Sequence, residues 1–159
     1  MRYYVQPDMS STFDSLYIEV MQFYAEHMHR LDSGAADEWA AMFVEDGTFE
    51  MPVLPEPVRG RVELSVMVRR GAERLAAAGE VHRHWHGMVA VHPEGDTVMV
   101  RCYAMIYATP RGGETRLHRS CVCEDVLVRE NGELKVRHRR VTRDDGFTVP
   151  QGNSEAARA

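Results

Sequence analysis

The spacing of hydrophobic residues changes near residue 80, and this change restricts the fold more than any other feature of the chain. Before it, apolar residues recur every three or four positions, as on one face of a helix. After it, apolar and polar residues tend to alternate, as in strands. The sequence therefore predicts helices first and a sheet second. That order is typical of an α+β fold.

Helical periodicity covers three segments of the first half. The first follows possible capping residues at 11–14 and ends at Gly34. A shorter helix is expected over 35–43, and a third over 62–79, where Gly79 would close it.

Strand signals dominate the second half. A short strand is expected at 48–53, and the proline-containing segment 54–61 is expected to hold no regular ladder. Turn-forming residues separate four longer alternating runs, so that consecutive strands can pair as antiparallel hairpins. These runs are 81–92, 96–108, 114–129 and 133–142. Without βαβ alternation, the expected sheet is antiparallel and carries its helices on one face.

The length of 159 residues suits one domain with a buried core. We expect that domain to cover 1–149 and the polar segment 150–159 to be a flexible tail. The strand at 96–108 has apolar residues at both parities, which indicates that both of its faces are covered. One face would meet the helices and the other a second subunit, so a homodimer is expected.

Charge and composition exclude several classes of partner. The net charge is -5 and the basic residues are scattered, so nucleic acid is not an expected partner. No stretch approaches the roughly 20 apolar residues of a membrane span, and no signal-peptide pattern is found. The three cysteines lack zinc-ribbon spacing, which favours buried, reduced thiols in a cytoplasmic protein.

Three histidines alternate in the stretch VHRHWHG, at His82, His84 and His86. On a strand they share one face with Met88, and the outer two lie about 13 Å apart. All three cannot easily bind one metal ion, so no metal site is expected here. The better interpretation is a single base, His84, with His86 as a neighbour.

Several segments between residues 13 and 145 form a recognisable set: FYAEHMHRLDSGAADEWAAMFVEDGTFEMP, PVRGR, HRHWHGMVAV and GELKVRHRRVT. Together they resemble the SnoaL-like group of the nuclear-transport-factor-like, scytalone dehydratase-like superfamily. It implies a cone-shaped α+β barrel, in which a curved sheet wraps around three helices and a deep pocket. The group includes polyketide cyclases, dehydratases, isomerases, dehydrochlorinases and non-catalytic binders, so fold alone does not assign a function.

The resemblance also implies a catalytic dyad. In the dehydratases and dehydrochlorinases, a histidine on the strand after the third helix is the base. An aspartate at the end of the first helix holds it. The matching residues are His84 and Asp32. Such a base can remove a proton next to a carbonyl, and water can then be lost without a metal or organic cofactor.

Further residues are candidates for the substrate pocket. Tyr24, His27 or His86 would help the leaving oxygen, and Cys121 and Cys123 stand where the fungal dehydratase has a serine and an asparagine. Arg140 shares its parity with apolar Leu134 and Val136, so it is a candidate clamp for an anion or carbonyl. Its alternative is a salt bridge with a helix acid. Tyr107 is assigned to the pocket, with the dimer face as its alternative.

The expected function is that of a cofactor-independent dehydratase or cyclase acting on a hydrophobic, aromatic polyketide-type intermediate. Two alternatives stay open. The same dyad could catalyse double-bond isomerisation or aldol cyclisation, or the chain could be a non-catalytic small-molecule-binding or assembly protein.

Overall fold

The computed structural model describes residues 9–149 of the chain. The expected tail at 150–159 lies outside the described residues. Three helices, α1 to α3, and two short strands, β1 and β2, come first, and the four long strands β3 to β6 follow. The bounds are α1 Met9–Asp32, α2 Ala36–Ala40, β1 Phe43–Glu50, β2 Val58–Arg59, α3 Arg61–Ala78, β3 Glu80–Glu94, β4 Thr97–Pro110, β5 Arg116–Glu130 and β6 Glu133–Arg143.

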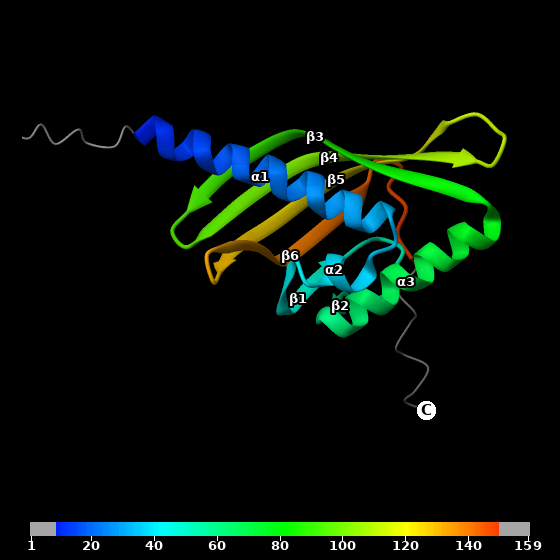
Figure 1. Ribbon diagram of the computed structural model, residues 1–159, viewed down its shortest axis with the longest axis horizontal. Helices are drawn as coiled ribbons and strands as arrows, with labels where there is room; N and C mark the ends of the chain where they lie inside the picture. Colours follow the sequence, from blue (N-terminus) through cyan, green and yellow to red (C-terminus); the bar gives the residue numbers. More distant parts are fainter. Residues whose placement is uncertain (1–8, 150–159) are drawn as a thin grey trace, which may run out of the picture.

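The six strands form one sheet in the order β2-β1-β6-β5-β4-β3. The long helix α1 crosses one face of this curved sheet, while α2 and α3 lie beside β1 and β2 (Figure 1). The α+β class with helices gathered on one face of a curved sheet is therefore confirmed. We call the face under α1 the inner face of the sheet and the opposite face the outer face.

Three details of the expected sheet are wrong. The strand β1 runs parallel to β6, so the sheet is mixed and not purely antiparallel. It starts at Phe43, earlier than expected, and β2 forms in the segment that was expected to hold no ladder. The curved sheet is open, with β2 and β3 at its two edges.

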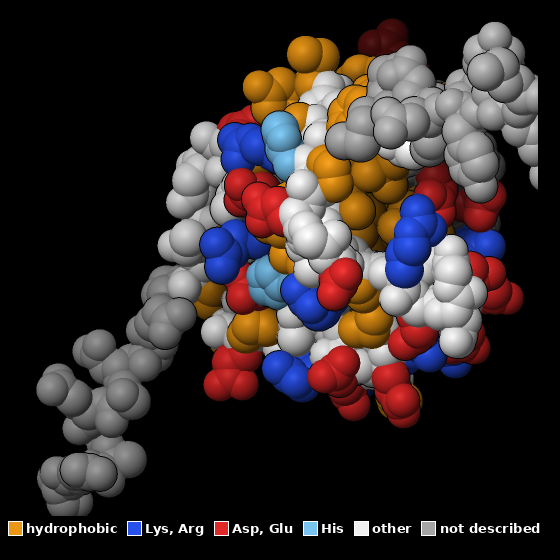
Figure 2. Space-filling view, turned by 90° about the vertical axis from the view of Figure 1, so that its left-hand side faces the viewer, with side chains coloured by type: hydrophobic (Ala, Val, Ile, Leu, Met, Phe, Trp, Pro, Cys, Tyr) orange, Lys and Arg blue, Asp and Glu red, His pale blue; other side chains and the backbone are white. Residues whose placement is uncertain are grey.

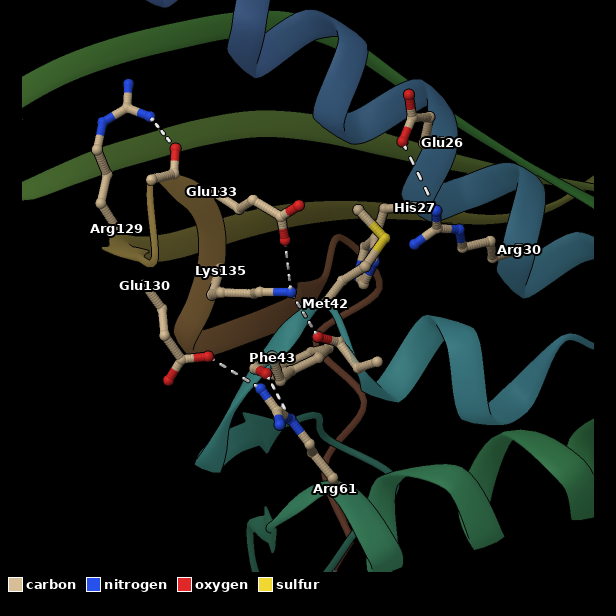
Figure 3. A network of polar contacts seen from close by, with 12 residues as sticks. Glu26, His27, Arg30, Met42, Phe43, Arg61, Arg129, Glu130, Glu133 and Lys135 are labelled. Atoms are coloured by element: carbon tan, nitrogen blue, oxygen red, sulfur yellow. Dashed lines mark hydrogen bonds and ion pairs between the residues drawn. The ribbon is translucent and has the colours of Figure 1, made fainter.

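The core lies between the helices and the inner face. Its largest fully buried side chains include Trp39, Phe43, Leu64 and Leu127. Arg61, the first residue of α3, connects this helix to the sheet by hydrogen bonds (Figure 3). Its guanidinium donates hydrogen bonds to the Phe43 carbonyl oxygen at 2.8 Å and to Glu130 at 3.1 Å.

A bulge in β3 changes which side chains reach the inner face. The pairing with β4 shifts between Gly87 and Ala90, so that Met88 and Val89 both lie opposite Cys102. Met88 has a φ of 52° and its residue is 77% exposed. The expectation that Met88 shares a face with the histidines is therefore wrong.

Charges of both signs surround the end of the molecule where α1 begins. Figure 2 shows acidic and basic side chains interspersed around a central group of hydrophobic ones, with no extended basic area on this face. Within residues 9–149, no helix has the length and apolar character needed to cross a bilayer.

Candidate functional site

Asp32 and His84 lie in direct contact, although 52 residues separate them in the chain. The Nδ1 atom of His84 is 2.6 Å from Oδ1 of Asp32, and the backbone N–H of His84 donates to Oδ2 at 3.1 Å. An ionised carboxylate only accepts hydrogen bonds, so the imidazole donates from Nδ1. In the neutral ring Nε2 is then the unprotonated nitrogen, and no hydrogen bond within residues 9–149 occupies it.

The end of α1 and the strand β3 position this pair. Asp32 is the last residue of α1, and Gly34 follows with a φ of 74°. Glycine suits this turn for a second reason, because a Cβ there would come within 3.3 Å of the Ala72 side chain. His84 lies on β3. The side chains of both residues are mostly buried, with 22% of the His84 side chain and 9% of the Asp32 side chain exposed.

The neighbouring histidine His82 has a different carboxylate partner. Its Nε2 lies 2.7 Å from Glu80, and Arg116 donates to the same carboxylate at 3.3 Å. The His82 ring also lies near the ring of His118, with centroids 4.8 Å apart. The three alternate histidines therefore have different hydrogen-bond partners.

A buried polar cluster occupies the inner face beneath α1, and its centre is Asp125. Arg139 donates two hydrogen bonds to this carboxylate, at 2.8 and 2.6 Å. The hydroxyl of Tyr24 donates a third, at 2.6 Å. Burial raises the pKa of Asp125, but Arg139 and Tyr24 lower it more, and the net pKa lies below its usual value. Burial and Asp125 raise the pKa of Tyr24 well above its ordinary range, so Tyr24 remains a donor.

Two thiols and an imidazole adjoin this cluster. Cys102 and Cys123 lie opposite one another on β4 and β5 and are almost fully buried. Nδ1 of His86 lies 3.4 Å from Sγ of Cys102, and Sγ of Cys123 lies 3.4 Å from Oδ1 of Asp125. The Cys123 thiol, and then His86, lower the pKa of Cys102 to about 6 against the effect of burial.

Arg140 does not face the inner side of the sheet, and its expected role as a clamp is not supported. A bulge shifts the β5–β6 pairing between Val136 and His138, which reverses the parity beyond it. The Arg140 side chain is 55% exposed and donates to Glu50 at 2.8 Å. Its neighbour Arg139 takes the inner position instead. Sequence reasoning missed Arg139 because nothing local marks the bulge.

Tyr107 also lies away from the dyad. It pairs with Arg83, and its side chain therefore lies on the outer face, opposite to the histidines. The structure therefore does not place Tyr107 beside the dyad, where it was expected. Cys121 is buried on the inner face, where burial raises the pKa of its thiol.

His27 lies in the core and not on a pocket wall. It is fully buried and stacks between Phe23 and Trp39, with ring centroids 5.4 and 5.1 Å away. Its Nδ1 lies 3.3 Å from Sδ of Met42, a contact seen in Figure 3. Burial lowers the pKa of His27 well below its ordinary value, so the ring stays neutral. A role as an acid in the chemistry is not supported.

Asp125 and Cys102 are the other residues of the cluster that sequence reasoning left out. The signal for Asp125 was present, since it shares its parity with Cys121, Cys123 and Leu127. A charged residue at an otherwise apolar parity indicates a buried polar partner.

Two surface hollows lie outside the dyad. One, of about 260 Å³, is formed by the segment between β1 and β2 and by the end of β6. The other, of about 270 Å³, involves outer-face residues of β4, β5 and β6. Arg140 lines both hollows, whereas neither is lined by His84 or Asp32.

Comparison with known proteins defines the class to which this fold and site belong. The chain matches the SnoaL-like domain over residues 15–140. No curated protein sequence matches it. Among solved structures, Aln2 from a Streptomyces species is 36% identical, with a TM-score of 0.75 over 82% of this chain and 92% of that protein.

Two further structures are similar over most of their length. A protein from Catenulispora acidiphila, solved in complex with S-DNPA, is 33% identical, with a TM-score of 0.75 over 83% of this chain and 96% of that one. ActVI-ORFA from Streptomyces coelicolor is 29% identical, with a TM-score of 0.78 over 84% of this chain and 98% of that protein. The chain belongs to the SnoaL-like family, which includes polyketide cyclases and dehydratases.

Proposed function

We propose that this protein is a cofactor-independent dehydratase or cyclase that acts on a hydrophobic, aromatic polyketide-type intermediate. The observation that carries the proposal is the contact between His84 and Asp32. It joins a base to the group that orients it, and the two come from different elements. The similarity to Aln2 and ActVI-ORFA supports the family of reactions. The S-DNPA complex of a relative supports a small-molecule ligand.

In this proposal His84 is the general base. Because Asp32 accepts the Nδ1–H, Nε2 has its lone pair free to take a proton from a carbon next to a carbonyl. The imidazolium that forms is stabilised by the carboxylate of Asp32. The electron pair left on carbon then expels a β-hydroxyl, which leaves as water once it has been protonated.

The proton for that leaving group needs a donor, and His86 is our candidate. It lies two residues from His84 on the same strand face, at a spacing of about 6–7 Å. Tyr24 is less suitable because its hydroxyl already donates to Asp125. Only Nδ1 of His86 faces Cys102, so Nε2 can carry the proton to be transferred.

Turnover of candidate aromatic β-hydroxyketones, followed as loss of water by mass spectrometry, tests the proposal. We expect His84→Ala to lower kcat by about 10²–10⁴-fold, the usual contribution of a general base. The matched control is His82→Gln, on the same strand face but bonded to Glu80, which should keep its kcat. Equal activity of wild type and His84→Ala would refute the dyad.

The same assay separates the alternatives. Exchange of the substrate's α-proton for deuterium without loss of water would indicate an isomerase or aldol cyclase with the same base. Binding without exchange or turnover would indicate a non-catalytic binding protein.

We further propose that the outer face of the sheet pairs with a second copy of the chain. Trp85, Tyr103 and Tyr107 are exposed there, with 58%, 45% and 38% of their surface accessible. Aromatic side chains are enriched at such interfaces. We expect a dimer by analytical ultracentrifugation and a monomer for Tyr103→Glu.

The three free cysteines are consistent with the reducing cytoplasm, which we propose as the location.

A further inference from the structure

The thiol-imidazole group on the inner face consists of His86, Cys102 and Cys123. One ring nitrogen of the histidine and the two Sγ atoms all lie within 4.8 Å of one another. The residues come from β3, β4 and β5, so three neighbouring strands converge on one point. Both cysteines have only 1% of their surface exposed.

The spacing of these atoms matches that of ligands around zinc. With Zn–S bonds of about 2.3 Å and Zn–N bonds of about 2.0–2.1 Å, tetrahedral geometry puts ligand atoms roughly 3.5–3.8 Å apart. Nδ1 of His86 already lies 3.4 Å from Sγ of Cys102. The remaining separations need only small side-chain rotations, since none exceeds 4.8 Å.

Strand pairing explains why the three side chains meet. Cys102 and Cys123 are directly opposite in the β4–β5 ladder, where side chains point to the same face. His86 pairs with Ala104, one inner-face position from Cys102. The bulge turns the Met88 side chain outward, so that Val89, which packs against the core, is the β3 side chain opposite Cys102.

Charge balance also favours a cation here. Asp125 already neutralises Arg139 through two hydrogen bonds, so the guanidinium leaves little positive charge for a thiolate. Two thiolates, a neutral imidazole and a divalent cation have no net charge together. Such a neutral group avoids much of the cost of burying an unpaired ion.

We propose that His86, Cys102 and Cys123 form a binding site for one Zn²⁺ ion per chain, with a fourth ligand taken from solvent. Two soft thiolates and an imidazole suit zinc better than calcium or magnesium, which prefer oxygen ligands. The site differs from the alternate histidines, because it uses His86 alone of the three. It is independent of the dyad, and it uses Nδ1 of His86, which leaves Nε2 for the donor role proposed above.

Titration of the full chain with Co²⁺ tests this proposal. The protein is freed of metal with a chelator and kept reduced with a phosphine, and free thiols are counted to exclude a Cys102–Cys123 disulfide. We expect saturation at one Co²⁺ per chain, with thiolate-to-cobalt charge-transfer absorption in the near ultraviolet and intense visible bands of tetrahedral cobalt. Addition of Zn²⁺ should bleach both, because zinc binds such ligands more tightly.

Near-isosteric variants locate the ligands. Cys102→Ser and Cys123→Ser should each lose the charge-transfer bands, and His86→Gln should weaken zinc binding. The loss of zinc affinity should exceed the roughly 10–100-fold effect of removing a residue that only hydrogen-bonds to a metal ligand. The matched control is Cys121→Ser, which alters the remaining buried thiol on β5 and should leave cobalt binding unchanged. Circular dichroism confirms that each variant is folded.

Two results would overturn the proposal. The first is a reduced wild-type protein that shows no thiolate-to-cobalt absorption, which would leave the group as hydrogen-bonded thiols. The second is cobalt binding that survives Cys102→Ser and Cys123→Ser but disappears in His82→Gln. That result would place the metal on the His82–His118 pair, whose rings lie 4.8 Å apart.

Discussion

Asp32 holds His84 at two atoms, since its carboxylate accepts hydrogen bonds from both the imidazole Nδ1 and the backbone N–H of the same residue. The backbone bond joins the end of α1 to β3. We expect the side-chain bond to set the tautomer of the ring, so that one carboxylate controls both the position and the protonation pattern of the proposed base.

The tautomer of His84 is the first prediction. In the wild-type protein, nitrogen-15 NMR should show the neutral ring protonated at Nδ1. Asp32→Asn replaces an obligate acceptor with a group that can donate, so the proton should shift toward Nε2. Glu80→Gln, which alters the partner of His82, should leave the His84 signals unchanged. An unaltered tautomer in Asp32→Asn would show that the carboxylate does not set it.

The adjacent residues Arg139 and Arg140 should differ sharply in their effect on stability. Arg139→Met leaves the Asp125 carboxylate buried without its cation, and should lower the free energy of unfolding by about 3–5 kcal/mol. Arg140→Met removes an exposed ion pair with Glu50 and should change it little. Urea denaturation of both variants measures the difference. Similar values would contradict the parity change at the β6 bulge.

His27 should make stability depend on pH. Burial lowers the pKa of the folded His27, while an unfolded histidine takes up a proton below about pH 6.5. The contribution is therefore present above about pH 6.5 and is lost as the pH falls below that value. His27→Phe removes this group and its unpartnered Nε2, so it should flatten the free energy of unfolding between about pH 7 and pH 5.

Chemical denaturation at several pH values measures that slope. His29→Gln is the matched control, because His29 lies exposed on the same helix. It should retain the wild-type slope, and an unchanged slope in His27→Phe would show that His27 is not neutral in the folded protein.

Replacing Met88 in the β3 bulge with glycine should stabilise the folded protein. A φ of 52° is unfavourable for an L side chain, and this one is largely exposed and has little packing to lose. Met88→Gly should raise the free energy of unfolding by roughly 0.5–1 kcal/mol, net of the entropy cost of glycine. Thermal denaturation measures this change. In the same experiment Val81→Gly, at an exposed β3 position without a positive φ, should lower the free energy of unfolding.

Several parts of the structure could be predicted because they depend on neighbouring residues. The end of α1 follows from Gly34, whose left-handed conformation suits glycine. The shared face of His82, His84 and His86 follows from strand geometry. The pairing of His84 with Asp32 came instead from the resemblance of these segments to the SnoaL-like group, because no local spacing relates residues so far apart.

The errors arose where pairing over long distances decided the result. The parallel contact between β1 and β6 joins residues as distant in sequence as Thr48 and His138, and no periodicity indicates it. The expected inner position of Arg140 followed from regular alternation after Val136, and the β6 bulge reversed that alternation.

The sequence by itself determined the order of helices and strands and the α+β class, because hydrophobic periodicity, caps and turns act over a few residues. Only the tertiary structure decided which polar side chains are enclosed. Bulges in β3 and β6 send Met88 outward and Arg139 inward, and strand register brings Cys102 opposite Cys123. A one-residue shift moves side chains to the other face of a sheet, and it is fixed by contacts between distant strands.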